Sequence, residues 1–429
     1  MKPINAHGTT PNISIEFAFF TMEINLLTSL LLFAAPFLFF VIRKYSTSVN
    51  KNLPPGPRPL PIIGNMHQMA KDPHIVAANF AKKYGPLISL RLGTRFLVVA
   101  SSPEAAKEVL KTQDRYLSGR SIPDALQQSF IDYYLIWARD CNEHWKLCRT
   151  LCRAEFDFFP IVGALDLQGL RKDSLNQHDV LSSFSEAIVK ERRARIAKNM
   201  VLEDHEKDFL DLLLENNFTN AQINILVLDL CVAGTDTVVT TIEWAMAELI
   251  KNQNIMHKVQ EELKRELSSK SIMNFDLSKL TYFNACIKET LRLHPAVPVL
   301  IPRRAIEACE VMNYTIPQNS QVWVNVWAIG HDPKVWEDPN AFKPERFLGS
   351  NIDFTGHDYE FIPFGGGRRM CPGLLSGVKS LQTILAPLIL EYDWSLPYNE
   401  DPAKLDMTEK FGVTLQKEKP LELIFKRRE

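Results

Sequence analysis

The chain has 429 residues, of which 46% are hydrophobic, and a formal net charge of −1 at pH 7. This length and composition are enough for a large buried core. A charge near zero speaks against a nucleic-acid-binding surface, so we expect no nucleic-acid partner. The seven cysteines form no pair at C-x-x-C spacing, which favours a reducing compartment over a disulfide-rich secreted protein.

The N-terminal region predicts a single membrane anchor. Residues 24–42 carry no charge, and as a helix they would span about 28 Å, close to the thickness of a bilayer's hydrocarbon core. Arg43 and Lys44 follow at once, so the positive-inside rule places the rest of the chain in the cytosol. A cleaved signal peptide is the alternative, which the unpaired cysteines disfavour. We therefore expect a leader over residues 1–21 and a transmembrane anchor over residues 22–43.

Residues 44–62 predict a stiff, extended hinge. Five prolines between Leu53 and Pro61 exclude a helix or a central strand there. An exposed ligand for a proline-binding module would have the same composition. The position between an anchor and a folded domain favours a spacer.

The remaining residues, 63–429, predict one domain that is mainly α with small β-sheets, an α+β fold. Residues 87–92 and 95–100 are expected to form a β-hairpin. Long helices are expected in the middle of the chain, and short strands after Pro295 and near residues 412–425.

The longest predicted helix, residues 221–252, is apolar on nearly every face and should be central and buried. Within it, Gly234 weakens the helix, and the Thr237 hydroxyl can donate a hydrogen bond to the carbonyl of Ala233. Asp236 lies beside the polar notch that this would create, where a carboxylate is costly unless it is used or paired. An acid next to an alcohol suits proton delivery. A back-bonded threonine beside a solvated acid is the simpler interpretation.

A cysteine in a glycine-rich loop, residues 361–373, is the most specific motif of the chain. Cys371 precedes a predicted apolar helix, whose N-terminus should favour the thiolate. The glycines allow the backbone to approach a large flat group, and N–H groups after Pro372 can donate to the sulfur. This arrangement suits an axial ligand of a haem iron. A phosphate-binding loop or a buried free cysteine are alternatives, although the three consecutive glycines depart from the G-x-G-x-x-G spacing.

The loop resembles the haem-binding signature of the cytochrome P-450 family at Phe364, Gly367, Arg369, Cys371 and Gly373. The resemblance implies the cytochrome P-450 fold behind one transmembrane helix. It also implies haem b (iron protoporphyrin IX) as the cofactor, with the thiolate of Cys371 as the axial ligand of the iron. Phe364, Arg369 and Gly373 would then belong to the cofactor-binding loop.

The same resemblance implies further cofactor contacts. Trp145 and Arg149, four residues apart on a predicted helix, are similar to the family's W-x-x-x-R element, which holds a haem propionate. Arg369 would join them, and Arg303 is a weaker candidate. Ordinary core packing would explain the Trp145–Arg149 pair equally well if it stood alone.

Two more motifs gain a role from the resemblance. Asp236 and Thr237 match the family's oxygen-activation motif and would be catalytic. Glu289 and Arg292, three apart on one helix, together with Arg346, resemble the family's structural triad. We assign the triad to structure, because its flanks are apolar and an exposed pair would contribute little.

Residues 289–425 resemble plant microsomal members, in particular geraniol and related monoterpenol hydroxylases. The resemblance implies a monooxygenase of the endoplasmic reticulum membrane that hydroxylates a small lipophilic substrate, a terpenoid, with O₂. Electrons would come from an NADPH–cytochrome reductase, since no nucleotide-binding unit is present in the sequence. Substrate-facing stretches are expected at residues 121–137, 228–237, 296–301 and 411–413.

The chain departs from the family between Arg149 and Ala233, where only 83 residues intervene and relatives have more. We place the break near Arg153–Glu155. A splice variant, a defective gene or a faulty gene sequence would each produce it. The rival hypothesis is therefore a truncated haem-binding relative with weak or no activity. A thiolate enzyme that rearranges peroxides is a third, which the Asp236–Thr237 pair disfavours.

Overall fold

The computed structural model describes residues 52–121, 134–151, 186–196, 207–267 and 275–428. Three predictions lie outside the described residues and stay predictions. They are the leader and anchor over residues 1–43, the first part of the hinge up to residue 51, and the break near Arg153–Glu155.

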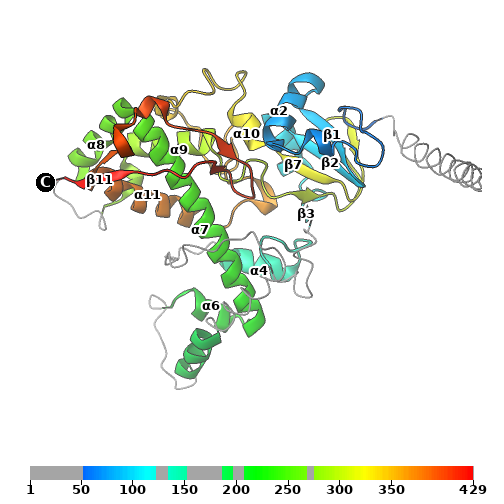
Figure 1. The fold of residues 1–429 in the computed structure, drawn as a ribbon. Coiled ribbons are helices and arrows are strands. Elements are labelled where there is room, and N and C mark those ends of the chain that lie inside the picture. The colour runs from blue at the N-terminus through cyan, green and yellow to red at the C-terminus, as the bar shows by residue number, and fades with distance from the viewer. Residues whose placement is uncertain (1–51, 122–133, 152–185, 197–206, 268–274, 429) are drawn as a thin grey trace, which may run out of the picture.

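One five-stranded sheet anchors the N-terminal side of the domain (Figure 1), with strand order β1-β2-β7-β4-β3. The predicted hairpin is confirmed with the predicted bounds, and Gly93 at φ +59° makes its tight turn. Strand β7 then pairs with β2 in parallel, and helix α2 packs on β1. The strands are β1 (Leu87–Leu92), β2 (Arg95–Ala100), β3 (Gly119–Arg120), β4 (Arg303–Arg304) and β7 (Gln321–Val324).

Three two-stranded sheets complete the β-structure of the described residues. They pair β5 (Cys309–Val311) with β6 (Tyr314–Ile316), β8 (Tyr392–Ser395) with β11 (Ile424–Arg427), and β9 (Glu409–Lys410) with β10 (Gln416–Lys417).

Helices make up most of the rest. The largest hydrophobic cluster joins α7, α8, α9 and α11 through side chains such as Leu249, Leu263, Phe283 and Leu385. The described helices are α2 (Pro73–Tyr84), α3 (Pro103–Lys107), α4 (Glu143–Leu151), α6 (Phe209–Glu215), α7 (Asn220–Lys251), α8 (Gln253–Leu267), α9 (Thr281–Leu293), α10 (Val326–Gly330) and α11 (Leu374–Glu391). Residues 186–196 are helical as well. A mainly α domain with small sheets is thus what the sequence predicted.

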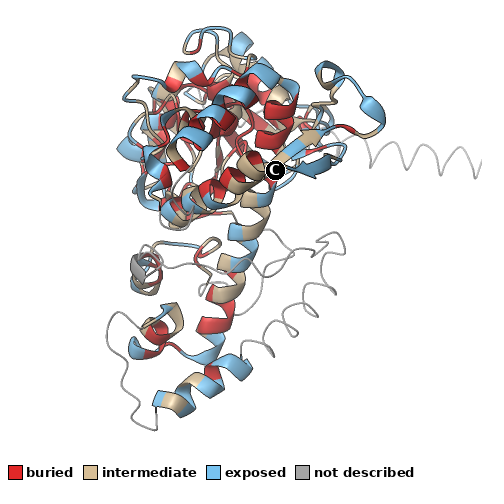
Figure 2. Ribbon diagram, turned by 90° about the vertical axis from the view of Figure 1, so that its left-hand side faces the viewer, coloured by how far each residue is buried: buried red, intermediate tan, exposed pale blue. Residues whose placement is uncertain are grey.

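Helix α7 connects two clusters of the molecule. It begins with a capping box between Thr219 and Gln222, which satisfies two N–H groups at the helix start. Its first turns pack with α4 and α6 in a smaller cluster that includes Leu213, Phe218 and Ile223, below the main body in Figure 2. Its last turns lie in the main core.

The middle of α7 differs from the sequence prediction of burial on nearly every face. Val232 is 39% and Val239 is 57% exposed. The reason is that the described elements packed on α7 concentrate at its two ends. By length and composition α7 and α11 would both be able to cross a membrane, but they pack against each other within the domain.

Candidate active site

The cysteine loop is held tightly against the helical turn of residues 108–112. Gly367 has φ +66°, and a Cβ there would lie 1.9 Å from the carbonyl oxygen of Leu110, so only glycine fits. The Cys371 N–H donates to the carbonyl of Phe364 at 2.9 Å. The N–H of Gly373 points at the Cys371 sulfur, and α11 begins at the next residue. The loop therefore presents one thiol, with a backbone donor directed at it.

Burial raises the pKa of the Cys371 thiol, while the N–H of Gly373 and the positive charge of Arg149 act to lower it. The sequence predicted a thiolate favoured by the helix start. In the protein alone the desolvation of a charged sulfur outweighs that effect. A bound metal ion reverses the balance, because a coordinating thiol is deprotonated outright.

Trp145 and two arginines stack beside this loop. The guanidinium carbon of Arg369 lies 4.7 Å and that of Arg149 5.3 Å from the ring centroid of Trp145. Arg369 donates from Nε to the Ser118 carbonyl and from Nη2 to the Ala138 carbonyl. Its Nη1 is buried and has no hydrogen-bond partner among the described residues. Such a donor is costly unless a ligand accepts from it.

Arg303 lies in the same region but already has a carboxylate partner. It donates to Asp114 at 2.8 Å and to the Gly366 carbonyl at 3.0 Å. It thus ties the cysteine loop to the sheet as well as adding positive charge. Its fit to a ligand carboxylate is weaker than that of Arg369, as the sequence had indicated.

Arg120 is a member of this cluster that sequence reasoning missed. Strand β3 pairs it directly with Arg303 of β4, and its Nη1 donates to the Ile301 carbonyl at 2.7 Å. Burial and the nearby charges of Arg369 and Arg303 hold its pKa well below the usual value. No local pattern marks Arg120, because the pairing joins two-residue strands far apart in the sequence.

These residues fit a haem. Four arginines, with one unused buried donor on Arg369, suit a ligand whose edge carries carboxylates. The glycine cradle and the Gly373 donor suit a flat group with a metal at its centre. Among the described residues no cluster of three or more His, Cys, Asp or Glu side chains has the geometry of a protein-only metal site.

The two proposed catalytic residues are half-buried in the middle of α7. The Thr237 hydroxyl donates to the Ala233 carbonyl at 2.6 Å, as its sequence position suggested. Asp236 does not rely on solvent alone, since its Oδ2 accepts from the Thr414 hydroxyl at 2.6 Å. The helix continues without a break through this segment. Thr414 could not be recognised as its partner from the sequence, because 178 positions separate the two residues.

Glu289, Arg292 and Arg346 meet in one buried triad. Arg292 donates to both carboxylate oxygens of Glu289, at 2.7 and 2.8 Å, and Arg346 adds a third contact at 3.0 Å. Glu289 is fully buried and Arg292 is 2% exposed. The arrangement is that of an internal brace, which suits a structural role.

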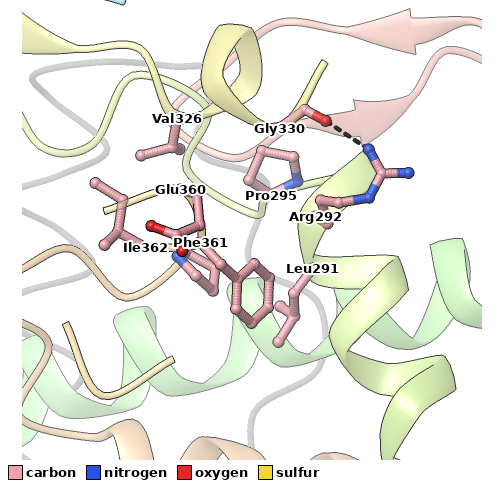
Figure 3. Close-up of a pocket in the computed structure, with 9 residues that line it drawn as sticks. Leu291, Arg292, Pro295, Val326, Gly330, Glu360, Phe361 and Ile362 are labelled. Carbon is pink, nitrogen blue, oxygen red and sulfur yellow. Dashed lines mark hydrogen bonds between the residues drawn. The ribbon is translucent and has the colours of Figure 1, made fainter. Parts of the chain in front are cut away.

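A small cavity of about 10 Å³ lies beside this triad, lined in part by Leu291, Pro295 and Phe361. Figure 3 shows Arg292 at its rim, donating to the carbonyl of Gly330. This space holds about one water molecule. A space of this size is far too small for an organic substrate, and none of the described residues that line it was expected to bind haem or deliver protons.

The expected substrate-facing stretches are only partly described, because residues 122–133 lie outside the described ranges. Phe411 stacks on His74 with ring centroids 5.2 Å apart, which is core packing. Val413 is 70% exposed. Leu300, whose backbone φ is +52°, packs near Gly365 of the cysteine loop. Leu300 thus lies beside the cysteine loop.

Asp229 is a second residue that sequence reasoning missed. Its Oδ2 accepts from the N–H groups of Leu135 and Ile136. The carbonyls of these two residues accept in turn from Trp145 and Arg120. Asp229 on α7 therefore fixes the segment that holds part of the arginine cluster.

Burial raises the pKa of Asp229 to about 7, which predicts a pH dependence. A raised carboxyl pKa means that the folded state binds a proton more tightly than the unfolded chain. Stability should therefore fall as pH rises, by up to about 1.4 kcal/mol per pH unit between about pH 4 and 7. Asp229→Asn, which keeps an acceptor oxygen, should flatten this slope in urea unfolding. An unchanged slope would contradict the assignment.

The model of the family described as cytochrome P-450 matches residues 54–165 and 153–425. The chain belongs to the cytochrome P-450 family. It is a plant cytochrome P-450 and an oxidoreductase of the monooxygenase type, and the family implies haem, O₂ and electrons from a redox partner.

Curated relatives of this cytochrome P-450 are plant hydroxylases. The chain is 38% identical to a probable (S)-N-methylcoclaurine 3'-hydroxylase isozyme 2 of Coptis japonica, over 91% of this chain and 96% of the relative. It is 36% identical to (S)-N-methylcoclaurine 3'-hydroxylase isozyme 1 of Papaver somniferum, over 92% and 98%. It is 36% identical to geraniol 8-hydroxylase of Swertia mussotii, over 96% and 99%.

The comparisons also bear on the short middle of the chain. The alignment with the Coptis relative runs over 478 positions, more than the 429 residues of this chain. The relative therefore carries residues that this cytochrome P-450 lacks. The two matches of the family model overlap at residues 153–165, where the sequence had indicated the break.

Proposed function

We propose that this cytochrome P-450 binds haem b through Cys371 and hydroxylates a small lipophilic substrate with O₂ and electrons from an NADPH-dependent reductase. The observation that carries the proposal is the donor set around the cysteine loop. Arg369 has an unused buried donor, and the Gly373 N–H is directed at the sulfur. The haem, when bound, supplies the chemistry that activates O₂.

Each residue around the cysteine loop would make a different contact with the cofactor. Cys371 would ligate the iron through its sulfur, from which the Gly373 N–H would withdraw charge. Arg149, Arg369 and, more weakly, Arg303 would neutralise the carboxylates of the cofactor, with Trp145 as the ring on which Arg149 and Arg369 stack. Arg120 adds charge to the same edge. Phe364 lies in the main hydrophobic cluster next to α11 and limits access of water.

Asp236 and Thr237 would hold and pass protons on the α7 side. Thr237 keeps its hydroxyl fixed by donation to the Ala233 carbonyl, while its lone pairs remain able to accept. Asp236, one residue earlier, offers a carboxylate that would take up a proton from water and pass it on. An acid and an alcohol at adjacent positions suit general acid catalysis.

The substrate class is proposed from two sources. The resemblance of residues 289–425 to monoterpenol hydroxylases favours a terpenoid alcohol as substrate. One relative is named as a geraniol 8-hydroxylase, which is in keeping with this. The relatives named for 3'-hydroxylation of N-methylcoclaurine favour an aromatic alkaloid as the second candidate. Both are small and lipophilic, which suits the apolar side chain of Leu300 beside the loop.

The membrane attachment is proposed from the sequence of the N-terminal region. The uncharged stretch within residues 22–43, followed by Arg43 and Lys44, supports one span in the endoplasmic reticulum membrane with the catalytic domain in the cytosol. Residues 44–62 would keep the domain at a fixed distance from the bilayer. That placement gives lipophilic substrates and a membrane-bound reductase access to the same surface.

The alternative is a haem-binding relative with weak or no turnover. The specific observation in its favour is the shortened stretch between Arg149 and Ala233, because the aligned relatives are longer than this chain. Helices lost from a large domain would admit water to the site and favour side reactions.

The proposed proton delivery is tested by Thr237→Ala. The variant should keep its haem spectrum and consume NADPH, but form roughly tenfold less product per NADPH and release more hydrogen peroxide, because one positioned proton donor is lost. Geraniol and N-methylcoclaurine would each serve as substrate in assays with a plant reductase.

Thr241→Ala is the matched control. Its hydroxyl donates to the Thr237 carbonyl at 2.8 Å, one turn further along α7, so the same backbone contact is removed away from the proposed chemistry. Fully coupled turnover by Thr237→Ala would refute the proton role. An unmodified chain with a normal haem spectrum and no product from either substrate would favour the inactive relative.

A further inference from the structure

The C-terminal hairpin of β9 and β10 lies against the part of α7 that carries Asp236. The Thr414 hydroxyl donates to Asp236 Oδ2 at 2.6 Å, a length typical of a hydrogen bond to an ionised acceptor. The Gln416 Nε2 donates to the other carboxylate oxygen, Asp236 Oδ1, over a longer distance of 3.4 Å. Thr414 is 6% exposed. Asp236 therefore has one strong partner, and that partner lies outside its own helix.

Thr414 is fixed in place by its neighbour. The Trp244 indole N–H donates to the Leu415 carbonyl at 2.7 Å, and the Leu415 N–H donates to the Ala296 carbonyl at 2.9 Å. Trp244 lies eight residues after Asp236, and so on the same face of α7. The backbone on which Thr414 sits is thus held to α7 and to the stretch after α9.

The base of the hairpin has a second attachment to α7. Glu409 contacts His294 at 3.2 Å and His74 at 3.3 Å, and His294 reaches Glu248 near the end of α7 at 2.9 Å. The ring of His294 also stacks on Trp244, with centroids 3.9 Å apart. The hairpin is therefore a rigid support, which is what an accurately placed side chain requires.

We propose that Thr414 is a positioning residue for Asp236: it holds the carboxylate in the one orientation from which it can take up a proton from water and pass it on beside Thr237. The inference rests on the proposed function, since it deepens the role given there to Asp236. A half-buried aspartate on a helix, such as Asp236, would otherwise sample more than one rotamer. One short bond to a buried, immobile hydroxyl selects a single one of them.

The test compares four variants of the full-length chain, one of which is Asp236→Asn. Thr414→Val removes the hydroxyl and keeps the shape, and Thr414→Ser keeps the hydroxyl. Thr408→Val is the matched control, because Thr408 lies at the start of the same hairpin and contacts Asp406 at the surface. If Thr414→Val yields little folded protein, Thr414→Ala takes its place.

Two readouts are needed. The first is product formed per NADPH, which should fall about tenfold in Thr414→Val, as expected for one lost charge-assisted hydrogen bond. It should be normal in Thr414→Ser and Thr408→Val. The second does not depend on turnover: the infrared carboxylate band of Asp236, isolated by subtracting the spectrum of Asp236→Asn. This band should shift in Thr414→Val and return in Thr414→Ser.

The outcomes separate this inference from the proposed function. Coupled turnover by Thr414→Val, with Asp236→Asn uncoupled, would overturn the role of Thr414 and leave that of Asp236 intact. Coupled turnover by Asp236→Asn would overturn both. Uncoupling in Thr414→Val with an unshifted Asp236 band would also overturn the inference, because Thr414 would then act by another route. If the chain shows no turnover, the shift of the infrared Asp236 band alone decides whether Thr414 orients the carboxylate.

Discussion

Cys371→Ala should abolish the red-shifted Soret band that the reduced, carbon-monoxide-treated protein shows when a thiolate ligates the iron. The sulfur is the only atom of the loop suited to this ligation, and the alanine variant leaves the backbone free to keep its form, since the Cys371 N–H to Phe364 bond does not involve the side chain. The alanine variant should therefore lose the red-shifted band completely, with no residual intensity.

The matched control is Cys309→Ala, which removes a partly buried cysteine on β5, outside the cysteine loop. It should keep the full band and the same haem content. The assignment of Cys371 would be wrong if its alanine variant showed an unchanged spectrum, or if Cys309→Ala lost the band equally. Haem content should be measured beside the spectrum, because the arginine cluster alone can retain some cofactor.

Features set by neighbouring residues were predictable from the sequence. The hairpin of β1 and β2 was expected at residues 87–92 and 95–100, and the structure has both strands there. The central helix was expected over residues 221–252 and runs from Asn220 to Lys251. Alternation, turn glycine and apolar composition fix such elements within a few residues, so no distant contact is needed to infer them.

Contacts between distant segments were not predictable in the same way. Arg120 meets Arg303 because two strands of two residues each pair, and two residues are too few to leave a periodic pattern. Thr414 meets Asp236 across 178 positions. The burial of α7 was overestimated for the same reason: its composition is apolar throughout, but the described elements that cover it gather at its ends.

In the cysteine loop, the residues could be predicted from the motif, but the burial of the sulfur could not. The sequence identified the thiol, the glycines and the donor after Pro372, because each belongs to one short stretch. It did not reveal that desolvation of the sulfur dominates in the protein alone, since burial depends on the whole fold. A helix start next to a cysteine is therefore not enough to predict a thiolate; the burial of the sulfur must be known as well.

Glu289→Gln should lower the free energy of unfolding by about 3–5 kcal/mol, the cost of breaking a fully buried ion pair by removing one partner. Glu289 accepts four hydrogen bonds, from Arg292 twice, from Arg346 and from the Lys343 N–H. A neutral amide cannot balance the two guanidinium charges, and its NH₂ group would face donors instead of acceptors. Arg292 would then remain buried and charged without its counter-ion.

Urea unfolding at neutral pH, followed by tryptophan fluorescence, measures this loss. Glu345→Gln is the matched control: Glu345 lies 56 residues further on, beside Arg346, but its ion pair with Lys258 is about half exposed. That pair should contribute about 0–1 kcal/mol. Equal destabilisation by the two variants would show that Glu289 is not the centre of the brace. A much larger effect of Glu289→Gln, with low haem content in cells, is the result that the triad geometry leads us to expect.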